Sequence, residues 1–246
     1  MIPLHDDNPT EIRPVVTVSF IAACVLIFLY QLSLDERAGL LFVYRLGAIP
    51  AVIFGKAALP PELAAISPAF SLITSMFLHG GFMHLIGNMV YLWIFGNNVE
   101  DAMGHGRFIV FYGTCGVLAA LTHALTAPDS RVPMIGASGA ISGVLGAYLL
   151  LYPHARVLVL IPLGIFTRLV YLPAGLVLGL WFALQLLSGT ASISQGGGGV
   201  AWFAHVGGFV AGMALIGVFK RRRVRFFNPP GPAPSGTTPT GRAKSG

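Results

Sequence analysis

Six apolar stretches alternate with more polar segments along the chain. They cover residues 14–32, 82–99, 107–126, 137–152, 169–188 and 200–219. A helix needs about 20 apolar residues to cross a hydrocarbon core of roughly 30 Å. The pattern therefore predicts an all-α membrane protein with a bundle of six transmembrane helices. This core spans 14–219, between a short N-terminal segment, 1–13, and a tail, 220–246, that begins basic and becomes rich in Pro, Gly, Ser and Thr, as disordered segments are.

The segments between the stretches differ in character. Segment 33–71 is too long and too apolar for a plain linker, and we expect it to be structured. Segment 157–166 is apolar and marked by proline, and we expect it to lie at the membrane interface. The glycine run 196–199 predicts a flexible loop. No basic region precedes the first stretch, which favours a retained span over a signal peptide.

Composition supports a membrane protein and gives its orientation. The chain is 55% hydrophobic and only 10% charged, whereas soluble domains carry about a quarter charged residues. Most of the 15 Lys and Arg residues lie in the N-terminal segment, the second and fourth connections and the tail. The positive-inside bias therefore predicts cytoplasmic termini. Because the net charge of +6 gathers beside a hydrophobic stretch, it indicates a lipid bilayer as partner and no nucleic acid. Cys24 and Cys115 lie within apolar stretches, as inert core thiols do.

Polar residues open three of the six stretches. His79, His84 and Asn88 stand at the start of the second, Ser138 at the start of the fourth and His205 at the start of the sixth. These three stretches run from the outer side inward, so all five residues are expected near the outer end of the bundle. Polar side chains in a membrane usually face the bundle interior or a water-filled cavity.

Small residues predict how two of these helices meet. The fourth stretch carries Gly139 and Gly143 one turn apart, and the sixth carries Gly208 and Gly212 with the same spacing. Such faces let membrane helices approach closely. Ser138 lies one residue before Gly139, and His205 lies three residues before Gly208. If the two faces pack in parallel, Ser138 and His205 differ in depth by roughly 3 Å. His205 could then activate Ser138 as a nucleophile.

Further groups could stabilise an oxyanion beside this serine. His84 and Asn88 share one helix face, and the Ser138 N–H is free at a helix start. Taken alone, Gly136-Ala-Ser138-Gly139 is more typical of a helix cap with packing glycines. The three histidines could suggest a metal, but no carboxylate or thiol joins them, so we expect no metal and no other cofactor.

The ordered set resembles the rhomboid family of intramembrane serine proteases, over about 14–219. The matching pieces are His79-x-x-x-x-His84-x-x-x-Asn88, Gly136-Ala-Ser138-Gly139 and Ala204-His205-x-x-Gly208-x-x-x-Gly212.

The resemblance implies a rhomboid-type six-helix bundle with a Ser–His dyad and no acidic third member. By matching positions, Ser138 is the nucleophile and His205 the base. The oxyanion donors are then His84, Asn88 and the Ser138 backbone N–H. Structural support would come from a histidine before the second span and from the motif glycines: His79, Gly136, Gly139, Gly143, Gly208 and Gly212.

The resemblance also implies how the protein would work in the membrane. Its substrates would be single-span transmembrane proteins, cut near the outer surface after small residues. Segment 33–71 corresponds to a half-embedded first loop, and the fifth span with the loop 188–199 to a gate and cap. The expected location is the plasma membrane of a bacterium.

Two departures from the family pattern stand out. Many relatives carry an aromatic residue four positions after the serine, packed on the catalytic histidine, but here the residue is Ser142. The base is then held less rigidly or positioned by another side chain. Phe70 and Ser71 replace a Trp-Arg pair that anchors the first loop in some members.

Two other functions remain open. A catalytically inactive rhomboid-like protein would bind membrane clients without cutting them. A small transporter would use the polar outer cavity, although transporters usually show internal repeats with helices broken near the midplane.

Overall fold

A computed structural model of the chain describes residues 1–163, 166–194 and 202–228. The predicted glycine loop at 196–199 and the tail from residue 229 onward lie outside these ranges. The helices are α1 (Val15–Ser33), α2 (Glu36–Leu46), α3 (Pro50–Ile53), α4 (Pro68–Thr74), the 3-10 turn η1 (Ser75–Phe77), α5 (Phe82–Met103), α6 (His105–Thr126), α7 (Ser138–Leu151), α8 (Ala174–Ser194) and α9 (Trp202–Phe219). The strands are β1 (Ile2–Asp6), β2 (Arg156–Leu163) and β3 (Phe166–Pro173).

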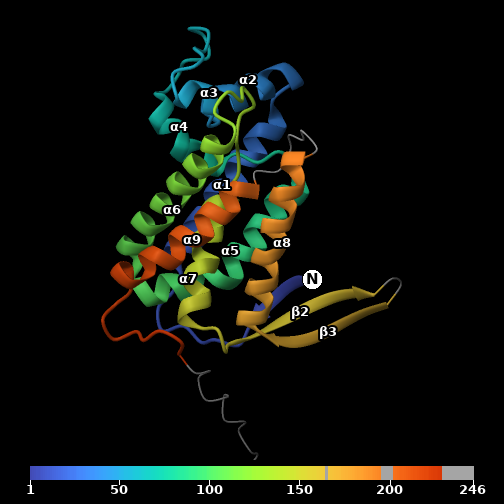
Figure 1. Ribbon diagram of the computed structural model, residues 1–246, viewed down its shortest axis with the longest axis vertical. Coiled ribbons are helices and arrows are strands. Elements are labelled where there is room, and N and C mark those ends of the chain that lie inside the picture. The colour runs from blue at the N-terminus through green and yellow to red at the C-terminus, as the bar shows by residue number, and fades with distance from the viewer. Residues whose placement is uncertain (164–165, 195–201, 229–246) are drawn as a thin grey trace, which may run out of the picture.

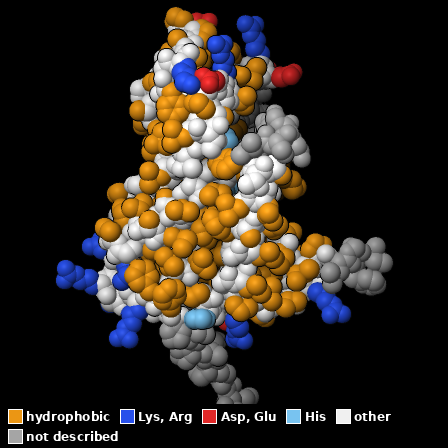
Figure 2. All heavy atoms as spheres, viewed as in Figure 1, with side chains coloured by type: hydrophobic (Ala, Val, Ile, Leu, Met, Phe, Trp, Pro, Cys, Tyr) orange, Lys and Arg blue, Asp and Glu red, His pale blue; other side chains and the backbone are white. Residues whose placement is uncertain are grey.

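The long helices form a bundle around α7 (Figure 1). Helices α2, α3 and α4 cover one end of the bundle, and the strands lie at the other, beside the N-terminus and the segment that follows α9. Almost every residue of α7 is buried, because its small residues let neighbouring helices close around it. Apolar side chains cover much of the visible flank, while most charged side chains gather toward the two ends (Figure 2).

Four helices are long and apolar enough to cross a membrane: Val15–Ser33, His105–Thr126, Ala174–Ala191 and Trp202–Phe219. A fifth candidate is the pair Pro68–Phe77 and Phe82–Met103, bent by 86°. The apolar helix Ser138–Leu151 is shorter, with 14 residues. The prediction of a mostly helical membrane protein is therefore confirmed with four to five candidate spans, and the count of six remains a prediction.

The first loop, 33–71, is structured as expected. It contains α2, α3 and the start of α4, and the side chain of Asp35 caps α2 by accepting a hydrogen bond of 2.7 Å from the N–H of Ala38. The Thr74 hydroxyl donates to the carbonyl of Leu46 at 2.6 Å. This contact fastens the loop to α4, the helix that carries Phe70 and Ser71.

The purely α-helical prediction was wrong at the end opposite this loop, where three strands form an antiparallel sheet in the order β1-β2-β3. Strand β2 covers most of segment 157–166, which was expected at the interface, and β1 lies in the N-terminal segment 1–13. The predicted fifth span began at 169, but 169–173 belong to β3 and the helix begins at Ala174. Because β2 is apolar on both faces, its periodicity does not separate strand from helix.

A buried carboxylate joins this sheet to the centre of the bundle. The hydroxyl of Tyr148, from α7, donates a hydrogen bond of 2.6 Å to Asp6 on β1. The Asp6 side chain is 4% exposed, and this burial raises its pKa from 3.8 to about 6, although the hydrogen bond from Tyr148 acts in the opposite direction.

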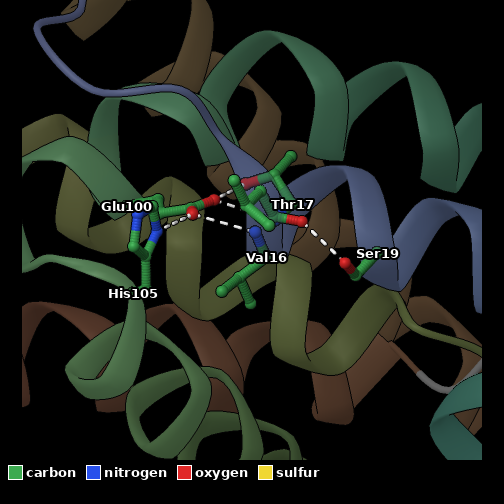
Figure 3. Close-up of polar contacts among 6 residues, drawn as sticks. Val16, Thr17, Ser19, Glu100 and His105 are labelled. Atoms are coloured by element: carbon green, nitrogen blue, oxygen red, sulfur yellow. Dashed lines mark hydrogen bonds and ion pairs between the residues drawn. The ribbon is translucent and has the colours of Figure 1, made fainter.

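A second buried carboxylate ties three helices together (Figure 3). Glu100, near the end of α5, accepts hydrogen bonds from the backbone N–H groups of Val16 and Thr17 at 2.9 and 2.8 Å and from the Thr17 hydroxyl at 2.7 Å. It also contacts the His105 ring of α6 at 2.6 Å. Because α1 begins after Pro14, with no side-chain cap of its own, Glu100 satisfies the free N–H groups of its first turn.

Glycines bring α7 and α9 into backbone contact. A Cβ atom added at Gly208 would collide with the carbonyl oxygen of Gly139, and one added at Gly212 with that of Gly143. A Cβ atom at Gly143 would also fall 2.5 Å from Cys115 of α6. The two small-residue faces therefore pack in the predicted register, with Gly139 against Gly208 and Gly143 against Gly212.

We expect Gly212→Ala to lower the free energy of unfolding by about 1–3 kcal/mol, because the added methyl group must displace the backbone of α7. The matched control is Gly179→Ala on α8, where an added Cβ would have no atom within 4 Å. Thermal unfolding in detergent measures both variants. Equal melting temperatures for the two would contradict the backbone contact.

We expect the stability of the protein to fall as the pH rises through the titration of Asp6. Its pKa is raised in the folded state, so the folded protein binds this proton more tightly than the unfolded chain does. Asp6 therefore contributes roughly 3 kcal/mol to the free energy of unfolding. This contribution is fully present below about pH 4 and is lost by about pH 6. Asp6→Asn keeps an oxygen for the Tyr148 hydroxyl but does not titrate. The difference in melting temperature between wild type and Asp6→Asn should therefore change between pH 4 and pH 7, and a constant difference would refute the assignment.

Candidate active site

Ser138 is the first residue of α7, and the turn before it is held in place by several backbone contacts. Gly136 has a φ of +122°, a conformation that L side chains rarely adopt, and its N–H donates to the carbonyl of Ser75 at 2.9 Å. Further back, Ala48 and Met134 exchange two backbone hydrogen bonds of 2.8 and 3.0 Å. The first loop thus braces the segment that presents Ser138.

His205, in the first turn of α9, faces this serine. Its Nε2 atom lies 2.8 Å from the Ser138 Oγ, a hydrogen-bonding distance. The glycine contact between α7 and α9 sets the two residues at matched depth. This arrangement provides a hydroxyl and an adjacent imidazole, the minimum for an activated nucleophile.

His84 and Asn88, on α5, converge on the same place from the other side. The N–H of Gly80 donates to the His84 Nδ1 at 3.3 Å, so the ring's hydrogen is on Nε2. A Cβ added at Gly136 would fall 2.6 Å from this Nε2 and 3.7 Å from the Asn88 Nδ2. The Asn88 Nδ2 is buried and has no hydrogen-bond partner among the described residues. Two donors therefore point toward the turn before Ser138.

His79 lies behind His84. Its backbone N–H donates to the side-chain oxygen of Gln31, from α1, at 3.1 Å, and its carbonyl accepts from the Gln31 amide at 3.2 Å. The buried His79 ring packs against that of His84, with ring centroids 5.2 Å apart. The loop before α5 is therefore tied to α1 through the His79 backbone, while the His79 ring supports His84.

A small cavity of about 40 Å³ adjoins Ser138. Its lining includes Met76, Gly116, Met134, Gly139 and Ala204. The walls are mostly apolar, and the small residues leave room for only a short side chain.

Three residues beside His205 were missed by sequence reasoning. The Gln185 Oε1 of α8 lies 2.6 Å from the His205 Nδ1. The rings of Trp181 and Trp202 lie 5.9 and 6.2 Å from the His205 ring. A signal was present, because Gln185 is a lone amide within an apolar stretch and Trp181 stands one turn before it.

Residues 67–222, more than half of the chain, match the model of the Rhomboid domain family. The chain belongs to the rhomboid family. Among curated relatives, the Rhomboid protease GluP of Bacillus subtilis is 32% identical over 214 residues, covering 85% of this chain and 37% of GluP. Rhomboid protein 1, mitochondrial, of Saccharomyces cerevisiae is 31% identical over 134 residues, covering 48% of this chain and 39% of the yeast protein.

A third rhomboid relative, the Putative rhomboid protease YdcA of Bacillus subtilis, is 38% identical over 78 residues, covering 32% of this chain and 39% of YdcA. The chain thus spans less than half the length of each of these relatives. Mitochondrial, plant and bacterial relatives are all represented. The family and the apolar helices together establish a multi-pass membrane protein. The relatives come from both mitochondria and bacteria, so they do not identify the membrane of this chain.

Proposed function

We propose that this chain is an intramembrane serine endopeptidase that cuts single-span membrane proteins near the outer membrane surface. The observation that carries the proposal is the distance of 2.8 Å between the His205 Nε2 and the Ser138 Oγ. Relatives named as proteases, GluP and YdcA, support the same activity.

The two residues divide the chemistry of peptide hydrolysis between them. The Ser138 Oγ attacks the carbonyl carbon of the scissile bond, and the His205 Nε2 takes the hydroxyl proton. His205 then gives this proton to the leaving amine nitrogen. In the second half, His205 takes a proton from a water molecule that attacks the acyl ester, and it returns this proton to the Ser138 Oγ as the acid product leaves.

Three donors would stabilise the negative charge that develops on the carbonyl oxygen. They are the His84 Nε2–H, the Asn88 Nδ2–H and the backbone N–H of Ser138. The Asn88 amide is buried without a partner among the described residues, so a substrate oxyanion would satisfy a donor that is otherwise idle. Such preorganised donors stabilise the transition state more than the ground state.

The cavity beside Ser138 would receive the side chain that precedes the scissile bond. At about 40 Å³ it suits small residues, in keeping with the preference that the family resemblance implies. We expect the substrate to enter from the lipid, since Ser138 begins a helix that packs against the membrane-crossing candidates α6 and α9.

The described ends of the chain support the proposed orientation. The N-terminus and the basic segment that starts at Lys220 lie at the end of the bundle opposite the candidate site (Figure 1). Both would face the cytoplasm by the positive-inside bias, with the site toward the outer surface. The core 14–219 and a location in a bacterial plasma membrane are part of this proposal.

Labelling with a fluorescent fluorophosphonate tests the activated serine. Wild-type protein in detergent should be labelled, and Ser138→Ala should not be, because it lacks the nucleophile. The rate of labelling of His205→Ala should be at least about 100-fold lower, because the serine hydroxyl keeps its proton.

Cleavage of a model single-span substrate completes the test. A folded wild type that neither labels nor cleaves but binds the substrate would instead be an inactive client-binding protein, and one that moves a solute would be a transporter.

We expect Asn88→Ala to lower the turnover of a model single-span substrate by about 10- to 1,000-fold, the range found when one oxyanion donor is removed. The KM should change little, because the donor acts mainly on the transition state. Initial rates over a range of substrate concentrations measure both constants. A raised KM with unchanged turnover would mean that Asn88 binds the substrate and does not stabilise the oxyanion.

A further inference from the structure

The candidate base has a second polar contact, on the side away from the serine. The Gln185 side chain comes from α8, is 9% exposed, and places its Oε1 atom 2.6 Å from the His205 Nδ1. Three helices thus contribute one polar side chain each to a continuous chain of contacts, from Gln185 through His205 to Ser138.

The chemistry of the amide determines the direction of these bonds. A side-chain amide oxygen only accepts hydrogen bonds, so the His205 Nδ1 must carry a hydrogen. A neutral imidazole then has its lone pair on Nε2, which faces the Ser138 hydroxyl. Without the Gln185 oxygen, the ring could carry its hydrogen on Nε2, and this tautomer cannot take the proton of the serine.

Helix α8 also supplies one aromatic contact of His205, which α7 lacks. Ser142 stands where many relatives have an aromatic residue, and its hydroxyl turns back to the carbonyl of Ser138 at 2.6 Å. Trp181, one turn before Gln185, lies against the His205 ring at 5.9 Å with an interplanar angle of 39°. The face of α8 that carries Trp181 and Gln185 therefore holds the ring in both orientation and tautomer.

We propose that Gln185 is a positioning residue that fixes His205 in the Nδ1–H tautomer, extending the Ser–His dyad by a neutral third member. This inference rests on the proposed protease function for its kinetic consequence, but the contact itself does not. As a neutral amide, Gln185 orients the imidazolium that forms during the reaction. It stabilises the positive charge of this ring only through the dipole of its amide group. Among the described residues, the titratable groups whose charges act on His205 are the imidazoles of His84 on α5 and His123 on α6.

The first test reads the tautomer directly and needs no activity. In ¹⁵N spectra of histidine-labelled protein at pH 8, the His205 signals are assigned by their loss in His205→Ala. In the wild type, the His205 Nδ1 should be protonated and the His205 Nε2 unprotonated. Gln185→Met, which keeps the length of the side chain but removes the amide, should lose this preference. A protonated Nε2 in the wild type, or an unchanged tautomer in Gln185→Met, would overturn the proposal.

The second test compares rates of fluorophosphonate labelling and of substrate cleavage. Gln185→Met should lower both the labelling rate and kcat by about 10- to 100-fold, part of what a positioned base contributes, with KM and melting temperature little changed. Leu186→Met, an exposed neighbour on α8, is the matched control and should behave as wild type. A fall confined to KM, or parallel falls in the control, would refute a positioning role.

Gln185→Glu separates positioning from simple packing. The carboxylate can still accept from the His205 Nδ1, so it should restore labelling relative to Gln185→Met, and its charge should move the acid limb of the pH–rate profile to higher pH. An unshifted limb would contradict the contact. If wild type shows the expected tautomer but no labelling, the protease function fails while the Gln185 contact stands, so the two failures are distinguishable.

Discussion

The backbones of α7 and α9 touch where glycines face each other. Gly139 lies against Gly208 and Gly143 against Gly212, with no room for a Cβ atom at either Gly208 or Gly212. Two helices in such contact cannot slide along each other without lifting apart, so their register is fixed. Ser138 precedes the first of these glycines by one residue and His205 precedes its partner by three. Their separation of 2.8 Å is thus a consequence of the glycine contact more than of any interaction between the two side chains.

The other helices supply what this pair lacks. Helix α5 brings His84 and Asn88 to the turn before Ser138, and its end holds Glu100, which receives the start of α1. Helix α1 in turn holds the backbone of His79 through Gln31. Glu100 near the end of α5 and Gln31 in the last turn of α1 therefore hold α5 at both ends. Within a membrane, where unpaired polar groups are costly, these paired contacts fix the helix that carries two proposed oxyanion donors.

The glycine spacing predicted the contact of Ser138 with His205 once the two small-residue faces were assumed to pack in parallel, because such faces carry their register in the sequence. The sheet was not predictable in the same way. Val157 and Val159 are buried while neighbouring strand residues are also apolar, so the alternation that identifies a strand is absent. The link between Glu100 and α1 joins residues more than 80 positions apart, and nothing local to Pro14 indicates it. Gln185 was visible as an isolated amide, but its partner depends on how α8 rotates against α9. Gly175 and Gly179 of α8 do not specify this rotation, because an added Cβ at Gly179 would meet no atom within 4 Å and one at Gly175 would lie against Pro153.

That rotation is set by aromatic packing, in contrast to the glycine contact of α7. The Phe182 ring stacks on Phe209 of α9 with centroids 4.5 Å apart, and Trp181 lies against both Phe209 and His205. Large rings keep α8 farther from α9 than glycines would, and they pack without a fixed register. Gln185 is three residues after Phe182, so any displacement of α8 that separates the rings also lengthens the contact from Gln185 to His205. With Ser142 too small to reach the ring from α7, the geometry of the proposed base depends on the position of α8, whereas the position of the nucleophile does not.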